Sequence, residues 1–223
     1  MASQSNQPLP STGADATAKN GPIAPADDPS NIGRLLSFWF EHDHPDGVGK
    51  WFQSSPDVDA ECRLWMPLVE AARAGQLSGW TSTPDGTLAL LLLLDQLPRN
   101  VYRGTETAFA AGETALKIAV DAVARGDDRR VPLDRQMFFY LPLMHHESLL
   151  AQVACLGLYQ GMAARAEPGT PQREMFDGAL GFCQAHIDAI RRFGRFPGRN
   201  AALGRESTEE ELAYLREIGQ RGF

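Results

Sequence analysis

The sequence lacks any apolar run long enough to cross a membrane. Its longest run, Leu88 to Leu94, is far shorter than the ~20 residues that span a bilayer. The N-terminal segment has neither the apolar stretch of a signal peptide nor the arginines of a transit peptide. We therefore expect a soluble cytoplasmic protein with no membrane partner.

Cysteine is scarce. The chain contains three, Cys62, Cys155 and Cys183, and no CxxC pair. An odd number of widely separated cysteines argues against a disulfide framework. Each lies among apolar residues at helical spacing, which is typical of small core residues in a reducing compartment.

Positive charge is also in deficit, with 21 basic residues against 28 acidic ones and a net charge of −7. This balance argues against non-specific binding to nucleic acid, which basic surfaces drive. The sequence contains no GxSxG motif, no P-loop and no dinucleotide-binding fingerprint. We therefore predict no cofactor.

Residues 1–28 contain almost no bulky apolar side chains and are rich in Ala, Ser, Pro and Gly. Such a segment cannot offset the entropy cost of ordering, so we predict a disordered tail. The remainder, residues 29–223, is the right size for a single domain with its own core.

Convincing strand alternation is absent, and helical periodicity dominates after the tail. The leucine run around Leu88–Leu94 predicts a helix buried on all sides, and Pro98 should end or kink it. Ser207 and Glu210 predict a capping box for the last helix. Three helices are predicted to start at Asp28-Pro29, Ser55-Pro56 and Thr83-Pro84. Five more are predicted over residues 105–124, 134–143, 145–164, 171–193 and 207–218. We predict an all-α fold, a compact bundle or an array of helical hairpins.

Two segments resemble each other: LDQLPRNVYRG and RFPGRNAALGRE. The matching positions are Arg99 with Arg199, Asn100 with Asn200 and, more loosely, Arg103 with Arg205. On one reading, these side chains satisfy backbone carbonyls where proline interrupts a helix. On the other, the two segments meet, and Arg99 and Arg199 bind an anion between them. We expect Phe193 and Phe196 to be buried and to hold the second segment against the core.

Asp95 is the one acid in the leucine run, and a lone buried carboxylate is costly unless it is paired. Arg99 lies four residues further on, which predicts an ion pair. An acid–base or ligand-orienting role for Asp95 is the alternative.

The segment HHES, from His145 to Ser148, raises the question of a metal site. On a regular helix His145 and Glu147 would diverge by about 200°, so they could not share one ion. The HExxH spacing is absent, and we predict no metal. His145 and Gln152 would share a face and point into a polar pocket. His145 is either a core or interface histidine whose hydrogen bonds are satisfied, or one member of a proton-transfer pair with Glu147.

The motifs FWF, LLLLDQLPRN-x-YRGT, FFYLP-x4-HES and FGRFPGRNAALGREST together resemble the DUF924 family of bacterial proteins of unknown function. The likeness runs from about Leu35 to Phe223. It implies an all-helical fold similar to tetratricopeptide repeats and brings no accepted activity. The family's polar signature falls on Asp95, Gln96, Arg99, Asn100, Arg103, His145, Glu147, Gln152, Arg195, Arg199, Asn200, Arg205 and Glu206. The family usually has an acid where Met144 stands and often a histidine where Gly198 stands. This chain lacks both, which disfavours a metal site and a general base beside Arg199.

Two functional hypotheses follow. The first is a tetratricopeptide-like binding module whose polar pocket or groove takes a small anionic molecule or a peptide. Its ligand-binding residues would be Gln96, Arg99, Asn100, Arg103, Gln152, Arg195, Arg199, Asn200 and Arg205. The alternative is a small hydrolase-like enzyme in which His145, Glu147 and Asp95 are catalytic and the arginines hold an anion. The sequence does not decide between them, and it does not specify an oligomeric state.

Overall fold

The computed structural model describes residues 23–26, 28–53 and 55–219. These ranges contain ten α-helices and no strand, which confirms the all-α prediction. The helices are α1 (Ser30–Phe40), α2 (Pro56–Arg63), α3 (Met66–Arg73), α4 (Pro84–Leu91), α5 (Leu97–Val101), α6 (Gly112–Arg125), α7 (Met137–Met144), α8 (Leu149–Ala163), α9 (Pro171–Phe193) and α10 (Glu209–Ile218). None of them, in the described part of the chain, combines the length and the apolar character needed to cross a lipid bilayer.

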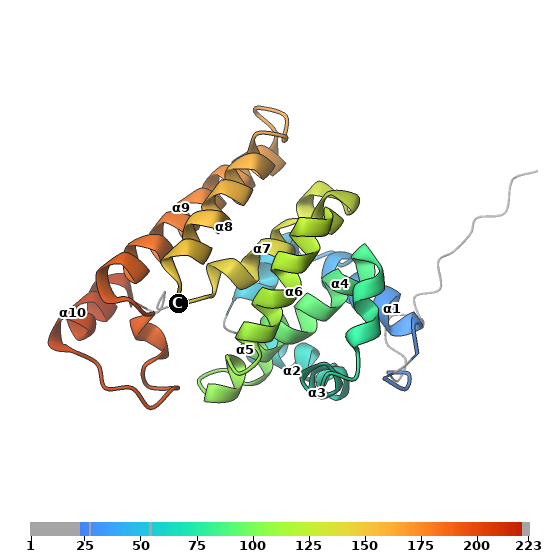
Figure 1. Ribbon diagram of the computed structural model, residues 1–223, viewed down its shortest axis with the longest axis horizontal. Coiled ribbons are helices and arrows are strands. Elements are labelled where there is room, and N and C mark those ends of the chain that lie inside the picture. Colours follow the sequence, from blue (N-terminus) through green and yellow to red (C-terminus); the bar gives the residue numbers. More distant parts are fainter. Residues whose placement is uncertain (1–22, 27, 54, 220–223) are drawn as a thin grey trace, which may run out of the picture.

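The short helical turns are η2 (Gly47–Phe52), η3 (Ser78–Ser82), η4 (Leu92–Gln96), η5 (Glu106–Ala108), η6 (Asp127–Arg130), η7 (Leu133–Arg135) and η8 (Pro197–Arg199). All are 3₁₀ turns except η4, which is a π-helical turn. Helices α1 to α7 form a body, and α8 and α9 form a long hairpin that projects from it (Figure 1). Helix α10 lies beside the C-terminal end of α9, away from the α8–α9 turn. The similarity to tetratricopeptide repeats remains a prediction.

The leucine-rich helix α4 lies at the centre of the body. Every residue from Leu88 to Leu94 is at most 2% exposed, as its all-round apolar character predicts. Its start is also as predicted, because the Thr83 hydroxyl accepts a hydrogen bond from the Gly86 amide at 3.1 Å. A β-carbon at Gly86 would lie 2.2 Å from the Trp80 carbonyl oxygen, so this close approach requires glycine.

Pro98 does not end the helical path, so of the two predicted outcomes, an end or a kink, the first is wrong. The chain widens into the π-helical turn η4, in which the Leu97 amide donates to the Leu92 carbonyl, and continues as α5 to Val101. Pro98 occupies the first turn of α5, where its missing amide donor costs little. The polar residues of this stretch therefore stay on a continuous helical path through the core; they are Asp95, Gln96, Arg99 and Asn100.

Four helix starts differ from prediction. Helix α6 begins at Gly112 and not at 105, and α7 begins at Met137 and not at 134. Helix α8 begins at Leu149, so the segment 145–148 is a turn between α7 and α8 and not the first turn of a helix. In α10 the capping box is formed by Thr208 and Glu211, one residue later than predicted. Ser207 instead accepts a hydrogen bond from the Asn200 side chain at 3.0 Å.

The C-terminal part has its own small core. Ala189, Ile190 and Phe196 form a cluster separate from the main one, with Tyr214 packed against it. Phe196 is fully buried as predicted, whereas Phe193 is only half-buried and contacts Tyr214 with ring centroids 5.0 Å apart.

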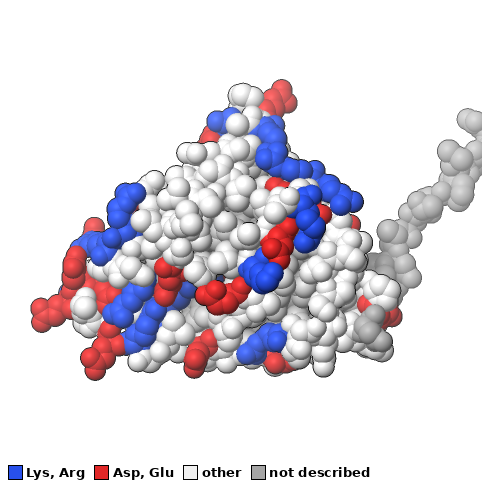
Figure 2. All heavy atoms as spheres, in the orientation of Figure 1, with Lys and Arg blue, Asp and Glu red and all other residues white. Residues whose placement is uncertain are grey.

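Charged residues gather around α10 and the lower edge, and an uncharged area covers much of the hairpin of α8 and α9 (Figure 2). On the described N-terminal side, Ile23 and Ala26 pack against the main core. The Asn31 side chain donates to the carbonyls of Ala24 and Pro25 at 3.3 and 2.8 Å. Residues 1–22 of the predicted tail lie outside the described ranges.

Candidate functional site

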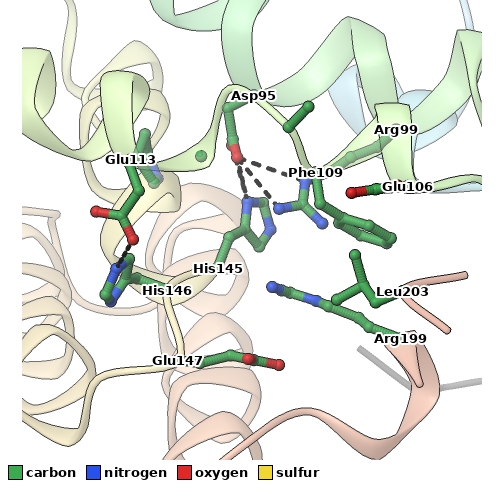
Figure 3. A pocket seen from close by; sticks show the side chains of 13 residues that line it. Asp95, Arg99, Glu106, Phe109, Glu113, His145, His146, Glu147, Arg199 and Leu203 are labelled. Carbon is green, nitrogen blue, oxygen red and sulfur yellow. Dashed lines mark hydrogen bonds and ion pairs between the residues drawn. The ribbon is translucent and has the colours of Figure 1, made fainter. Parts of the chain in front are cut away.

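A cavity of about 300 Å³ opens where four segments meet: η4 with α5, η5 with the start of α6, the α7–α8 turn, and η8. Its walls carry charged, histidine and apolar side chains (Figure 3). The lining residues are Asp95, Arg99, Glu106, Phe109, Ala110, Gly112, Glu113, Pro142, His145, His146, Glu147, Arg199 and Leu203. The pocket thus brings together residues that lie more than a hundred positions apart in the chain.

Asp95 and His145 form a close pair in the wall of this pocket. The His145 Nδ1 atom lies 2.8 Å from each carboxylate oxygen of Asp95. Gln96 Nε2 donates to the same carboxylate at 2.5 Å, and Arg99 Nη2 does so at 3.3 Å. The acid in the leucine run is therefore paired, and the predicted contact with Arg99 is present.

The charges of this pair are set by burial and by the neighbouring arginine. Burial and the positive charge of Arg99 lower the pKa of His145 to about 4, although Asp95 opposes them. Burial acts to raise the pKa of Asp95, but His145 and Arg99 outweigh it and hold this pKa well below its usual range. At neutral pH Asp95 is ionised and His145 is neutral. Its Nδ1–H donates to Asp95, which leaves Nε2 as an acceptor.

Arg199 is the most unusual residue of the site. Its side chain projects into the pocket (Figure 3), yet the residue is only 6% exposed. Its guanidinium lies 4.4 Å from the centre of the Phe196 ring and 5.0 Å from that of Phe109. Its buried Nε and Nη2 atoms have no hydrogen-bond partner among the described residues. The rings cover the faces of the guanidinium but accept nothing from its edge.

The charge of Arg199 is therefore poorly compensated. Burial, with the nearby positive charge of Arg99, lowers its pKa to about 9. A guanidinium remains largely protonated at neutral pH even then. A buried charged donor without an acceptor costs folding free energy, and an anion in the pocket would remove this cost.

Glu147 lines the pocket but does not pair with His145. Its two carboxylate oxygens accept from Arg205 at 2.7 and 2.9 Å, and one also accepts from the Phe196 amide at 2.8 Å. Burial acts to raise the pKa of Glu147, but these hydrogen bonds lower it overall. Glu147 thus remains an ionised acceptor held by Arg205.

The remaining polar residues of the second segment hold it to α10 and do not line the pocket. Arg195 binds both carboxylate oxygens of Glu211 at 2.7 and 2.9 Å. The Asn200 side chain accepts from Arg205 at 2.9 Å and donates to Ser207. Asn200 therefore does not stand beside Arg199 in the pocket.

Gln152 does not face the pocket either. Its amide nitrogen lies 3.2, 2.7 and 2.6 Å from the carbonyl oxygens of Leu143, Met144 and His146, at the end of α7. The predicted shared face with His145 does not exist, because α8 starts only after the His-His-Glu turn. Gln152 instead satisfies carbonyls that the end of α7 leaves open.

A second hollow of about 310 Å³ adjoins the first and shares Arg99, Phe109 and His145 with it. Gln96, Asn100 and Arg103 line this second hollow. The Asn100 side chain donates to the Trp51 carbonyl at 3.2 Å and accepts from Arg103 at 3.0 Å. Arg103 also pairs with Asp59 at 2.9 Å, so these donors are already occupied.

Sequence reasoning missed several pocket residues. Phe109, which stacks against Arg199, and Leu203 gave no signal because apolar residues are most often core. Glu106 and Glu113 are exposed acids in an acidic chain, and nothing local sets them apart. His146 was seen only as part of the HHE triplet, and its Nε2 lies 2.9 Å from Glu113.

Fold and site together define an all-helical protein with a polar pocket built from a histidine–aspartate pair and a buried arginine. The family model described as a bacterial protein of unknown function (DUF924) matches residues 35–219, and the chain belongs to this family. The chain is also similar to a solved structure, a protein of unknown function, ATU0120, from Agrobacterium tumefaciens. The two share 36% sequence identity with a TM-score of 0.72, over 84% of this chain and 98% of that one. None of the curated proteins matches the chain.

Proposed function

We propose that this protein binds a small anionic molecule in the pocket between α5, the α7–α8 turn and η8. The observation that carries the proposal is the Arg199 guanidinium, which is 6% exposed and has two buried nitrogens without an acceptor. The four other arginines of the two segments are already paired: Arg99 with Asp95, Arg103 with Asp59, Arg195 with Glu211, and Arg205 with Glu147. Arg199 is the donor left for a ligand.

The size of the pocket favours a small molecule over a long peptide. Its volume of about 300 Å³ is at the lower end of the range for small-molecule sites. Arg99 and Arg199 both approach the ring of Phe109, at 5.4 and 5.0 Å, so the positive charge of Arg99 adds to the attraction of an anion that binds Arg199.

The test is a calorimetric and thermal-shift screen of acetate, succinate, phosphate and sulfate against the wild type and Arg199→Gln. We expect at least one anion to raise the melting temperature of the wild type with increasing concentration and to have no effect on Arg199→Gln. Arg191→Gln is the matched control, because it removes the same charge from the exposed face of α9. The proposal fails if no anion binds the wild type, or if both variants respond like it.

A second candidate function, catalysis, is favoured by the Asp95–His145 pair. Asp95 fixes the His145 tautomer and leaves Nε2 as a base, which is the arrangement of many general acid–base sites. Glu147 would not take part directly, because Arg205 holds it.

A panel of small ester, amide and phosphoester substrates would test this. Turnover that is lost in His145→Gln and weakened in Asp95→Asn would support an enzyme. Anion binding without turnover of any substrate in the panel would favour the binding module.

A further inference from the structure

Charge is unevenly distributed within the pocket. The inner wall carries Arg199, which has two buried nitrogens without a hydrogen-bond partner among the described residues. The two inner acids are neutralised, Asp95 by Arg99 and Glu147 by Arg205. The inner wall therefore has one uncompensated positive charge.

The outer wall is acidic. Glu106 and Glu113 both line the pocket and both are exposed. The Glu106 carboxylate forms no hydrogen bond or ion pair with the residues that the structure describes, and the Glu113 side chain is 87% exposed beside His146. These two carboxylates have the opposite sign to Arg199: Phe109 lies between Glu106 and Arg199, and Glu113 lies on the opposite side of the pocket beside His146 (Figure 3).

Apolar groups line the space between these charges. Phe109, Pro142 and Leu203 contribute to the wall. In Figure 3, Phe109 and Leu203 lie on the same side of the pocket as Arg199, with Glu106 beyond Phe109 and Glu113 across from them. A ligand that reaches from Arg199 to one of the two exposed acids would contact these apolar side chains along its length.

We infer that the ligand is a small amino acid or related zwitterion, whose carboxylate binds Arg199 and whose amino group binds Glu106 or Glu113. This inference rests on the proposed function and adds the second charged group of the ligand. A dianion such as phosphate fits less well, because the two outer carboxylates repel it and only one inner cation lacks a partner. A monocarboxylate without an amino group satisfies Arg199 but leaves the outer carboxylates unused.

Titration calorimetry with two matched series tests the inference. One series runs from glycine through γ-aminobutyrate to ε-aminocaproate. The other contains the same chains without the amino group, from acetate through butyrate to caproate. We expect at least one amino acid to bind about tenfold more tightly than its amine-free partner, because a charge-assisted hydrogen bond is lost with the amine. The chain length with the largest ratio measures the separation between the two binding groups.

Glu106→Gln and Glu113→Gln identify the outer contact. The amide keeps the size of the side chain but loses its charge, so one of the two variants should reduce the ratio to near one while butyrate still binds as in the wild type. Glu217→Gln on α10 removes an exposed acid away from the pocket and should leave the ratio unchanged. Because Glu113 contacts His146, each variant's melting temperature is measured first.

Four results would overturn the inference. Equal affinity within every matched pair would show that the outer acids do not meet the ligand. A ratio that survives in Glu106→Gln, in Glu113→Gln and in the double variant would place the selectivity elsewhere. Binding of phosphate but of neither series would retain the anion site and reject the zwitterion, whereas failure of every anion would reject the proposed function as well.

Discussion

Arg199 and Arg205 come from the same short segment but lie in opposite electrostatic surroundings. Arg205 makes paired contacts with Glu147 across 58 positions of the chain. Arg199 is more deeply buried and has two buried nitrogens without an acceptor. The two arginines therefore allow a direct comparison between an arginine with an ion-pair partner and one that we propose binds a ligand.

Replacing each arginine with methionine should separate these roles. Arg205→Met leaves the Glu147 carboxylate without its partner and should reduce the free energy of unfolding by about 1–3 kcal/mol. Arg199→Met keeps the apolar contact with Phe109 and Phe196 and removes an uncompensated charge, so stability should stay the same or rise. Urea denaturation measures both. A larger loss in Arg199→Met than in Arg205→Met would mean that Arg199 has a structural role.

The buried histidines predict a pH dependence of stability. Burial is the main cause that lowers the pKa of His145 to about 4 and that of His186 to about 3. Both lie below the ordinary histidine value of 6.5. The unfolded chain therefore binds more protons between pH 6.5 and these values, and stability falls as the pH drops through this window. Each group contributes a slope of about 1.4 kcal/mol per pH unit.

Several charged groups act on His145: Asp95 raises its pKa, while Arg99 and Arg199 lower it. Urea unfolding at several pH values between neutral and pH ~4 should show a shallower slope for His145→Gln and for His186→Gln than for the wild type. His44→Gln, in the loop after α1, is the control and should keep the wild-type slope. Parallel curves for all variants would contradict the assignment.

At the level of helices, the sequence predicted the features that neighbouring residues determine, such as helix starts and all-round burial. Thr83-Pro84 marks the start of α4, and the leucine run after it is buried on all sides. The π-helical turn before Pro98 and the turn at His145–Ser148 were not predicted. Nothing local prevents a helix through HHES. The turn depends on distant partners, because Gln152 satisfies the end of α7 and Glu147 binds Arg205 from the C-terminal segment.

The last helix gives a test of capping. Thr208 accepts from the Glu211 amide at 3.1 Å, and Glu211 accepts from the Thr208 amide at 2.8 Å. Thr208→Ala should therefore destabilise the protein by about 1 kcal/mol. Glu210→Gln, which changes a neighbouring exposed acid outside the capping box, should have a smaller effect. Equal denaturant midpoints for Thr208→Ala and the wild type would mean that the box contributes nothing.

For the whole molecule, composition predicted one domain with an N-terminal tail, and periodicity predicted that the domain is helical. It could not indicate where ordered contacts begin. Ile23 and Ala26 pack on the core because Asn31 binds the backbone beside them, a contact without a sequence motif. The pocket was predictable only in part: the arginine segments pointed to Arg99 and Arg199, whereas Phe109, Glu106 and Glu113 come from a segment with no distinguishing pattern.

Two truncations should differ in stability. Removing residues 1–22 should leave the melting temperature unchanged, since their composition offers few apolar anchors. Removing residues 1–28 also deletes Ile23 and Ala26 and should lower it by a few degrees. Differential scanning calorimetry of both truncated proteins would measure this. An equal loss in both would place a stabilising contact within the first segment.

The separate C-terminal core has a consequence for local unfolding of the protein. Ala189, Ile190 and Phe196 form a small cluster, and the segment that carries Arg199 depends on it and on ion pairs to Glu147 and Glu211. A unit with so few apolar contacts unfolds locally at a lower free energy than α4. Amide hydrogens of α10 and of residues 196–205 should exchange with deuterium well before those of α4, and a bound ligand should slow this exchange. One wall of the pocket would then be its least stable part, and ligand occupancy would decide how often it opens.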